Sequence, residues 1–327
     1  MPLCDRFGRP IDYLRVSITD RCNLRCGYCM PEEGVPLRRH EEILTYEQIV
    51  RLVRVATEIG ITKVRLTGGE PLLRRGVVGL VQKLAQLPEI EELSMTTNGT
   101  TLSEHAAALA AAGLSRVNIS LDTLDQDRFR TITGRGRLAD VLHGILAAQE
   151  AGLAPVKINT VVLRAVNDDE VVEFARRTRT DGWHVRFIEI MPLGSGTCCA
   201  DELFVPASET KQRIEEELGP LEPAYVTGNG PARHCRLRGA TGTIGFIRPL
   251  SAHFCDLCNR LRLTADGRLL ACLLSDVEID LRTPLAHGLP DDRLRNLLLQ
   301  GIAAKPKGHR LDERAVPQEQ LMSQIGG

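Results

Sequence analysis

Three cysteines stand within eight residues near the start of this 327-residue chain, in the stretch RCNLRCGYCMPEEG at 21–34. They are Cys22, Cys26 and Cys29, called here the first triad. Three thiols do not complete a disulfide framework, which needs an even number, and they are one ligand short of a structural zinc site. The nearest downstream histidine, His40, stands in a charged segment. Three thiolates can hold a four-iron cubane and leave its fourth iron open. Because an open iron can bind a substrate, the three cysteines indicate a catalytic site.

The segment CDLCNRLRLTADGRLLAC at 255–272 repeats the pattern. Its cysteines are Cys255, Cys258 and Cys272, called here the second triad. Two interpretations are open. His253 completes a Cys3His zinc site, or the three thiolates hold a second cluster with an open iron.

Two arginines alternate within this segment, at Arg260 and Arg262, on one face of an expected strand. Paired guanidinium groups suit phosphate or carboxylate, although a solvated strand edge would carry the same pattern. The whole chain has 41 basic and 42 acidic residues and a formal net charge of -1. No global field therefore favours nucleic acid or an anionic membrane, and any anion must be bound by a local pocket.

The elements that position these residues follow an alternation of short apolar runs and amphipathic segments. The predicted strands are 11–19, 61–71 (ending in a glycine turn), 92–97, 116–121, 155–163 and 184–190, and the predicted helices are 45–60, 76–87, 103–112, 137–151, 168–179 and 208–219. Residues 191–202 are expected to form a loop and 225–242 a glycine-rich irregular stretch. Strands joined by helical crossovers form a parallel sheet. Six or seven such units predict an α/β fold, a partial (β/α) barrel, with an open doubly wound sheet as the alternative.

Polar side chains stand where most of these strands are expected to end, and in a parallel barrel those ends share one face. They are Arg15, Arg65, Thr67, Gly68, Gly69, Glu70, Thr96, Asn98, Ser120, Asp122, Lys157, Asn159, Arg186, Glu189 and Met191. The basic members, together with the two arginines of the second triad segment, would form a cationic pocket. Such a pocket suits a polyphosphate.

The spacing Cys-x3-Cys-x2-Cys, with Tyr28 directly before the last cysteine and a strand before the motif, resembles the signature of the radical S-adenosylmethionine superfamily. In that superfamily the open iron binds the amino and carboxylate groups of S-adenosylmethionine. An electron from the reduced cluster then cleaves the sulfonium to a 5'-deoxyadenosyl radical. The turn TGGEP supports the resemblance, because glycines such as Gly69 let the backbone approach a ligand closely.

The whole chain resembles the molybdenum cofactor biosynthesis protein A family, the GTP 3',8-cyclases. The segments KVRLTGGEPLLR, TTNGT, NISLDT, VKINTVVLRAVND, VRFIEIMPLG and the terminal glycine pair follow that family's order from end to end. The resemblance implies a barrel of the radical S-adenosylmethionine type over 1–225 and a C-terminal iron-sulfur extension over 226–327.

The implied reaction removes the ribose C3' hydrogen of GTP and joins C3' to guanine C8. The product is (8S)-3',8-cyclo-7,8-dihydroguanosine 5'-triphosphate, and this is the first step of molybdenum cofactor biosynthesis. The implied partners are GTP, an electron donor and the next enzyme of the pathway, with no nucleic acid or membrane partner and with a homodimer as the assembly.

The resemblance also assigns roles to single residues. One 4Fe-4S cluster would be held by Cys22, Cys26 and Cys29, and a second by Cys255, Cys258 and Cys272, whose open iron meets guanine. S-adenosylmethionine would touch Tyr28, Gly69, Ser120 and Met191. GTP would be held by Arg15, Arg65, Thr96, Lys157, Arg186, Arg260, Leu261 and Arg262. Gly326 and Gly327 would reach into the active site, where residues without side chains fit, and would act in catalysis with the first triad, Arg260 and Arg262.

Two other functions stay open at this point. One is another two-cluster radical enzyme, such as a peptide-maturing one, and the other is a non-catalytic zinc-binding module. The remaining cysteines have no ligand spacing and are expected to be free thiols: Cys4, Cys198, Cys199 and Cys235. No apolar run approaches the roughly 20 residues of a membrane span, and MPLCDRFGRP lacks the core of a signal peptide, so a cytoplasmic protein is expected.

Overall fold

One twisted sheet organises the computed structural model, which describes residues 3–192, 200–226, 230–275, 277–309 and 322. Within these residues the sheet has twelve strands in the order β12-β11-β10-β1-β2-β3-β4-β5-β6-β9-β8-β7. The strands are β1 Tyr13–Ser17, β2 Lys63–Thr67, β3 Glu92–Thr97, β4 Arg116–Ser120, β5 Lys157–Val162, β6 His184–Glu189, β7 Leu221–Pro223, β8 Arg233–Leu237, β9 Thr243–Ile247, β10 Arg260–Leu263, β11 Arg268–Leu270 and β12 Glu278–Asp280.

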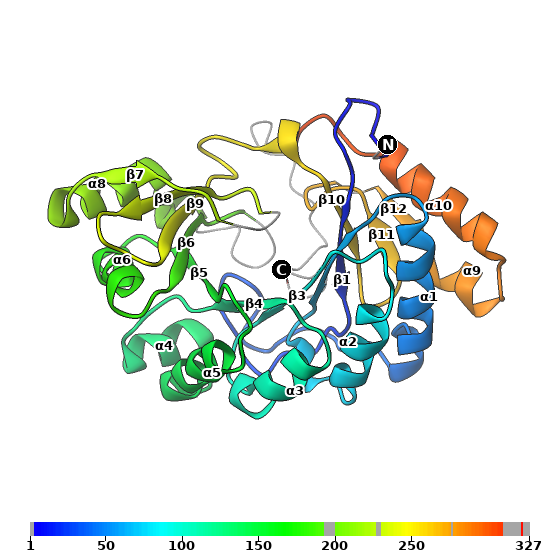
Figure 1. The fold of residues 1–327 in the computed structure, drawn as a ribbon, viewed down its shortest axis with the longest axis horizontal. Coiled ribbons are helices and arrows are strands. Elements are labelled where there is room, and N and C mark those ends of the chain that lie inside the picture. Colours follow the sequence, from blue (N-terminus) through cyan, green and yellow to red (C-terminus); the bar gives the residue numbers. More distant parts are fainter. Residues whose placement is uncertain (1–2, 193–199, 227–229, 276, 310–321, 323–327) are drawn as a thin grey trace.

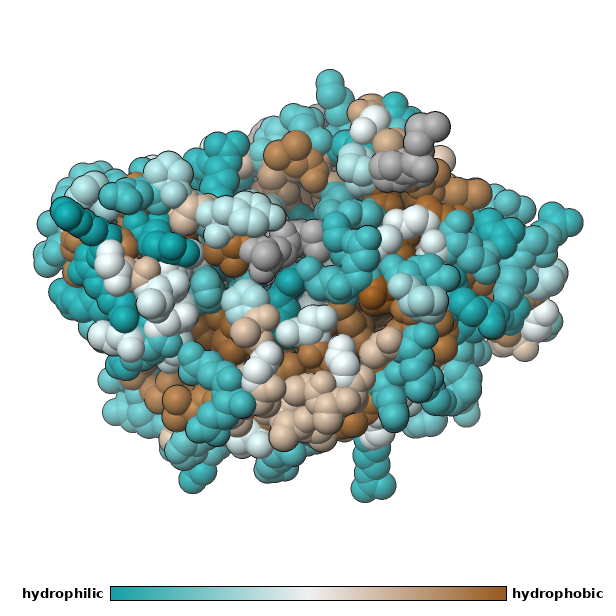
Figure 2. Space-filling view, viewed as in Figure 1, coloured by the Kyte–Doolittle hydropathy of each residue, from teal (hydrophilic) through white to brown (hydrophobic). Residues whose placement is uncertain are grey.

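The helices lie around the outside of the curved sheet (Figure 1). They are α1 Tyr46–Thr57, α2 Val77–Ala85, α3 Ala106–Ala111, α4 Gln126–Thr133, α5 Leu138–Glu150, α6 Val171–Thr180, α7 Ala200–Leu203, α8 Ala207–Leu218, α9 Arg282–Ala286 and α10 Asp291–Ala303. Short 3-10 turns occur as well, including η3 at Leu102–Glu104 and η5 at Cys255–Leu257. Hydrophilic side chains cover the outer helices on both sides of the view (Figure 2).

The predicted partial barrel is confirmed, as an open and mostly parallel sheet. The strands from β10 through β1–β6 to β9 pair in parallel, whereas β11, β12, β8 and β7 add antiparallel strands at the two edges. Because the edge strands do not pair with each other, the barrel does not close. Both strands that extend the parallel sheet, β9 and β10, come from the C-terminal part of the chain.

Side-chain alternation along each strand separates the apolar core from the barrel interior. In β1, Leu14 and Val16 are buried in the hydrophobic core beneath the helices, and Arg15 between them lines the interior. The helices bury the matching apolar stripes. Helix α1, for example, is started by Thr45, whose hydroxyl accepts the Gln48 N–H in a capping box.

The structure differs from the sequence prediction in several places, and α7 begins within the expected loop 191–202. Residues 225–242 were expected to be irregular, yet they contain β8, which pairs antiparallel with β9. Only Leu237 of this strand is buried, so the strand carries little apolar alternation, and its pairing with β9 decides its conformation. Helix α4 was not predicted; it begins at Asp125, whose carboxylate accepts the Arg128 N–H, and ends at Gly134 in the left-handed region. No helix in the described part of the chain has the length and apolarity to cross a bilayer.

Candidate active site

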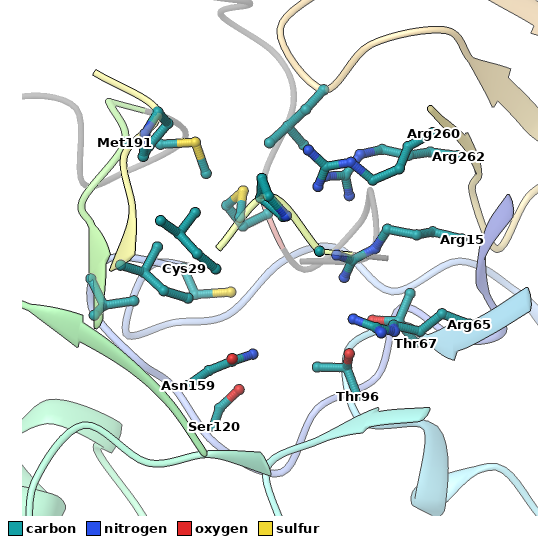
Figure 3. Close-up of a pocket in the computed structure, with 18 of the residues that line it drawn as sticks. Arg15, Cys29, Arg65, Thr67, Thr96, Ser120, Asn159, Met191, Arg260 and Arg262 are labelled. Atoms are coloured by element: carbon teal, nitrogen blue, oxygen red, sulfur yellow. The ribbon is translucent and has the colours of Figure 1, made fainter. Parts of the chain in front are cut away.

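A cavity of about 330 Å³ opens at the inner face of the sheet, and residues from both ends of the chain line it. Figure 3 shows part of its wall, with arginines on one side and Cys29 and Met191 on the other. Most of the residues predicted from the sequence meet here: Arg15, Cys22, Cys26, Tyr28, Cys29, Arg65, Gly69, Thr96, Ser120, Arg186, Met191, Cys255, Cys258, Arg260, Arg262 and Cys272.

The first triad lies in the loop that follows β1, and none of its half-buried thiols forms a disulfide. The N–H groups of Cys29 and Met30 both donate to the Cys26 carbonyl, at 2.8 and 3.1 Å, and so fix the tight turn of the motif. Burial raises the pKa of the Cys26 thiol well above its ordinary value, and repulsion by Cys29, Asp122 and Cys22 raises it further. Three thiolates gathered in this way need a cationic centre between them.

The turn after β2 clamps this cysteine loop in place. The Gly69 N–H donates to the Thr19 carbonyl at 2.8 Å, and the Glu70 N–H donates to the Arg21 carbonyl at 2.7 Å. A Cβ atom on Gly69 would lie 2.3 Å from the Arg21 oxygen. Glycine is therefore required here by the packing of two backbones, whereas the sequence suggested the close approach of a ligand.

A buried carboxylate joins the same turn to the end of β3. Glu70 is fully buried and accepts from Asn98 N–H at 2.6 Å, from Thr97 Oγ1 at 2.8 Å and from Leu72 N–H at 3.0 Å. Burial raises its pKa to about 7 even though these three bonds favour the charged form. Glu70 thereby fixes the first triad relative to the barrel, and its contacts are structural.

Tyr28 is held by the end of β4. Its hydroxyl donates to Asp122 Oδ2 at 2.6 Å, and the other oxygen of Asp122 accepts the Val161 N–H at 2.8 Å. Burial raises the pKa of Asp122 to about 6, against the effect of both bonds. The aromatic ring of the motif thus has a fixed orientation at the cavity wall. Ser120 and Asn159, from the neighbouring strands β4 and β5, line the same cavity (Figure 3).

The second triad lies in the C-terminal part of the chain, at η5 and just after β11. It lines the same cavity as the first triad. Burial opposes ionisation of Cys258, but the positive charges of Arg260 and Lys305 outweigh it and bring its pKa down to about 6. The Leu274 N–H also points to Cys272 Sγ at 3.5 Å. Burial raises the pKa of the Cys255 thiol. A stabilised thiolate such as that of Cys258 is suited to ligating iron.

The spacing of the cysteines bears on which metal centre they could hold. In the described parts of the chain, no three His, Cys, Asp or Glu side chains are placed to hold one metal ion. A tetrahedral zinc ion with Zn–S bonds of about 2.3 Å needs its sulfur ligands about 3.8 Å apart. In a cubane each thiolate binds a different iron, so three thiolates around a cluster lie farther apart than three around one zinc ion. His253 instead packs its ring against that of His309, with centroids 5.4 Å apart.

Buried guanidinium groups form one wall of the cavity. The sheet register places Arg15 of β1 between Arg65 of β2 and Arg262 of β10. Burial and mutual repulsion lower the pKa of Arg262 to about 10 and that of Arg186 to about 9. Among the described residues, Nε and Nη2 of Arg186 have no hydrogen-bond partner, although the side chain is only 3% exposed. Because a buried guanidinium needs an acceptor, this wall is built for an anion.

Among the predicted site residues that the structure describes, Lys157 and Leu261 do not line the cavity. Lys157 is the first residue of β5, not the last, and is buried; Arg186 and other arginines help to bring its pKa down to about 6, after the larger effect of burial. Leu261 faces the hydrophobic core, because it alternates with Arg260 and Arg262 along β10. Gly326 and Gly327 lie outside the described residues, as do Cys198 and Cys199. Cys4 and Cys235 form no disulfide.

Sequence reasoning missed Lys305, which lines the cavity beside the second triad. It stands in the segment KPKGH without any motif around it. Only burial distinguishes it, since a lysine that is 2% exposed is rare unless its charge is matched.

Comparison with known proteins agrees with this geometry. Residues 16–178 match the Radical SAM superfamily, and residues 183–311 match Molybdenum Cofactor Synthesis C. The chain is 53% identical over 324 residues to the GTP 3',8-cyclase of Moorella thermoacetica, covering 99% of both chains. It belongs to the GTP 3',8-cyclase family. The cyclase of Petrotoga mobilis is 48% identical, over 99% of this chain and 100% of that relative.

Membership of the cyclase family makes this chain a radical S-adenosylmethionine enzyme, with a 4Fe-4S cluster and S-adenosylmethionine as its cofactors. Among solved structures, Streptococcus suis SuiB bound to precursor peptide SuiA has a TM-score of 0.63 at 16% identity, covering 92% of this chain and 72% of that one. At this identity the likeness concerns the fold alone. The likeness to SuiB therefore does not favour a peptide substrate, whereas the two cyclases share about half of their residues with this chain.

Proposed function

We propose that this chain converts GTP to (8S)-3',8-cyclo-7,8-dihydroguanosine 5'-triphosphate, the first step of molybdenum cofactor biosynthesis. One observation carries the proposal: two cysteine triads and a wall of buried guanidinium groups open into the same cavity. The first cluster and S-adenosylmethionine, when bound, supply the radical chemistry that removes the ribose C3' hydrogen and lets C3' bond to guanine C8.

The chain's own residues bind and orient the reactants. Cys22, Cys26 and Cys29 would hold three irons of the first cluster and leave the fourth to S-adenosylmethionine, whose contacts would be Tyr28, Gly69, Ser120 and Met191. The second triad would hold a second 4Fe-4S cluster in the part of the chain from 226 to 327, with its open iron at the guanine. The triphosphate would lie against Arg15, Arg65, Arg186, Arg260 and Arg262. Thr96 of β3, Lys157 of β5 and Leu261 of β10 would complete the nucleotide site.

The pocket would bind the two ends of the nucleotide differently, with guanidinium groups at the triphosphate and the second triad at the guanine. Guanidinium groups offer forked donors that match phosphate oxygens. Their charges repel one another within the low-dielectric cavity, and a triphosphate removes that repulsion, so the pocket favours the triphosphate over a neutral nucleoside. Holding both ends fixes the ribose between the two triads, where the reacting carbon has to lie.

The remaining partners are part of the same proposal. An electron donor must reduce the first cluster, the product passes to the next enzyme of the pathway, and the chain acts as a homodimer in the cytoplasm. No nucleic acid or membrane takes part.

Two measurements test the proposal. The first is the iron and sulfide content per chain after anaerobic reconstitution. The second is an activity assay of the dithionite-reduced protein with S-adenosylmethionine and GTP. We expect about eight irons per chain and GTP-dependent formation of 5'-deoxyadenosine and the cyclised nucleotide. About four irons with zinc at the second triad would remove the second cluster from the proposal. A colourless, iron-free protein that binds two zinc ions would leave only the non-catalytic module.

A further inference from the structure

The segment Lys305–His309, called here the strap, follows α10 and crosses the second triad. Lys305 is 2% exposed, and its ammonium group donates to the Arg260 carbonyl at 2.7 Å and to the Ala271 carbonyl at 2.8 Å. Arg260 comes two residues after Cys258, and Ala271 comes directly before the last cysteine of the triad. One buried charge thus ties together the two chain segments that carry these thiols.

A second buried cation, Arg9, ties the strap to the remaining cysteine. Its Nη1 donates to the Cys255 carbonyl at 2.7 Å and to the Lys307 carbonyl at 3.0 Å, and its Nη2 donates to the Pro306 carbonyl at 2.6 Å. Its Nε donates to Asp5 at 2.6 Å, so its own charge is matched by a carboxylate. Every cysteine of the second triad therefore has a backbone carbonyl, its own or a neighbour's, held by a buried side chain.

The two cations differ in how their charge is balanced. Arg9 is paired with Asp5, whereas no ion pair to a carboxylate is found for Lys305 among the described residues. Burying an unmatched ammonium group costs several kcal/mol, on the order of the stability of a small domain. Lys305 lines the same cavity as Cys258 and Cys272, whose thiolates act on it as opposing charges.

We propose that Lys305 is a positioning residue for the second triad. It holds the backbone just after Cys258 and just before Cys272, and it balances the charge of these thiolates when they bind the cluster. This inference rests on the proposed second cluster. A cubane held by three thiolates is an anionic centre, and positive charge beside it makes reduction easier. Lys305 would thus set both the occupancy and the redox behaviour of the site.

Lys305→Met tests the proposal, with Lys307→Met as the matched control. Methionine keeps an unbranched chain of similar size and loses only the charge and the donors. The side chain of Lys307 is exposed in the same strap. After anaerobic reconstitution we expect Lys305→Met to hold about half the iron of the wild type, while the affinity of the first cluster for S-adenosylmethionine is unchanged. The control should match the wild type in both readouts.

Lys305→Gln covers the case in which the methionine variant does not fold. Glutamine keeps a donor but removes the charge, so we expect the second cluster to bind and its reduction midpoint, followed by electron paramagnetic resonance, to move to more negative potential. A residue that served only as a strut would leave that potential unchanged.

The outcomes separate the inference from the proposal beneath it. Wild-type protein with about four irons would overturn the second cluster itself, and the role of Lys305 with it. Wild-type protein with about eight irons, together with variants of equal iron content and equal potential, would overturn only the role of Lys305.

Discussion

A single methyl group added at Gly69 tests how the barrel holds the first triad. A Cβ atom there would lie 2.3 Å from the Arg21 carbonyl oxygen and 2.5 Å from the carbonyl carbon. Both atoms are backbone, so the cysteine loop would have to retreat by about 0.7 Å to restore the 3.0 Å that such contacts keep. Overpacking of this kind costs about 1–3 kcal/mol, and two strained backbone hydrogen bonds add about 1 kcal/mol each. We expect Gly69→Ala to lower the free energy of unfolding by about 3–5 kcal/mol.

The same displacement should empty the first site, because the loop that retreats carries Cys22 directly after Arg21. Denaturant unfolding of the cluster-free protein measures the stability, and iron content after reconstitution measures the site, where a loss of about half is expected. Gly79→Ala is the control: Gly79 is an exposed position in α2 with no atom within 4 Å of an added Cβ. That variant should gain about 0.5–1 kcal/mol. A Gly69→Ala protein with wild-type stability and full iron would refute the clamp.

Two further predictions concern the nucleotide and the C-terminus. Burial, together with Arg186, lowers the pKa of Lys157 to about 6, and a bound polyphosphate would raise it again, so GTP binding above this pH takes up a proton. Between pH 6 and 8 the Kd of the wild type for GTP should therefore rise by up to about tenfold per pH unit. The Kd of Lys157→Met should rise less steeply. Equal slopes of the two proteins in calorimetric titrations would contradict this prediction. Removal of Gly326 and Gly327 should abolish turnover with both clusters still bound, and wild-type turnover in the truncated enzyme would show that the tail is dispensable.

Local sequence was enough to predict most of the barrel. The β-branched runs and the amphipathic segments between them gave six βα units in their observed order, because side-chain periodicity is set by the conformation of the same few residues. It failed at β8, whose conformation depends on pairing with β9 rather than on its own pattern. It also failed for Lys157, which was expected where a strand ends. The strand predicted over 155–163 forms as β5, and Lys157 is its first residue.

The sequence by itself determined the chemistry: two cysteine triads, an aromatic residue in the first motif, and arginines in alternating positions. Only the tertiary structure decided how these parts meet. The pairing of β10 with β1 brings Arg262 beside Arg15, and it carries the second triad to the cavity of the first. The need for glycine at Gly69 and the burial of Lys305 likewise arise from backbones far apart in the chain. Spacing along a sequence records which ligands are present, whereas their convergence depends on sheet register and packing that no single segment encodes.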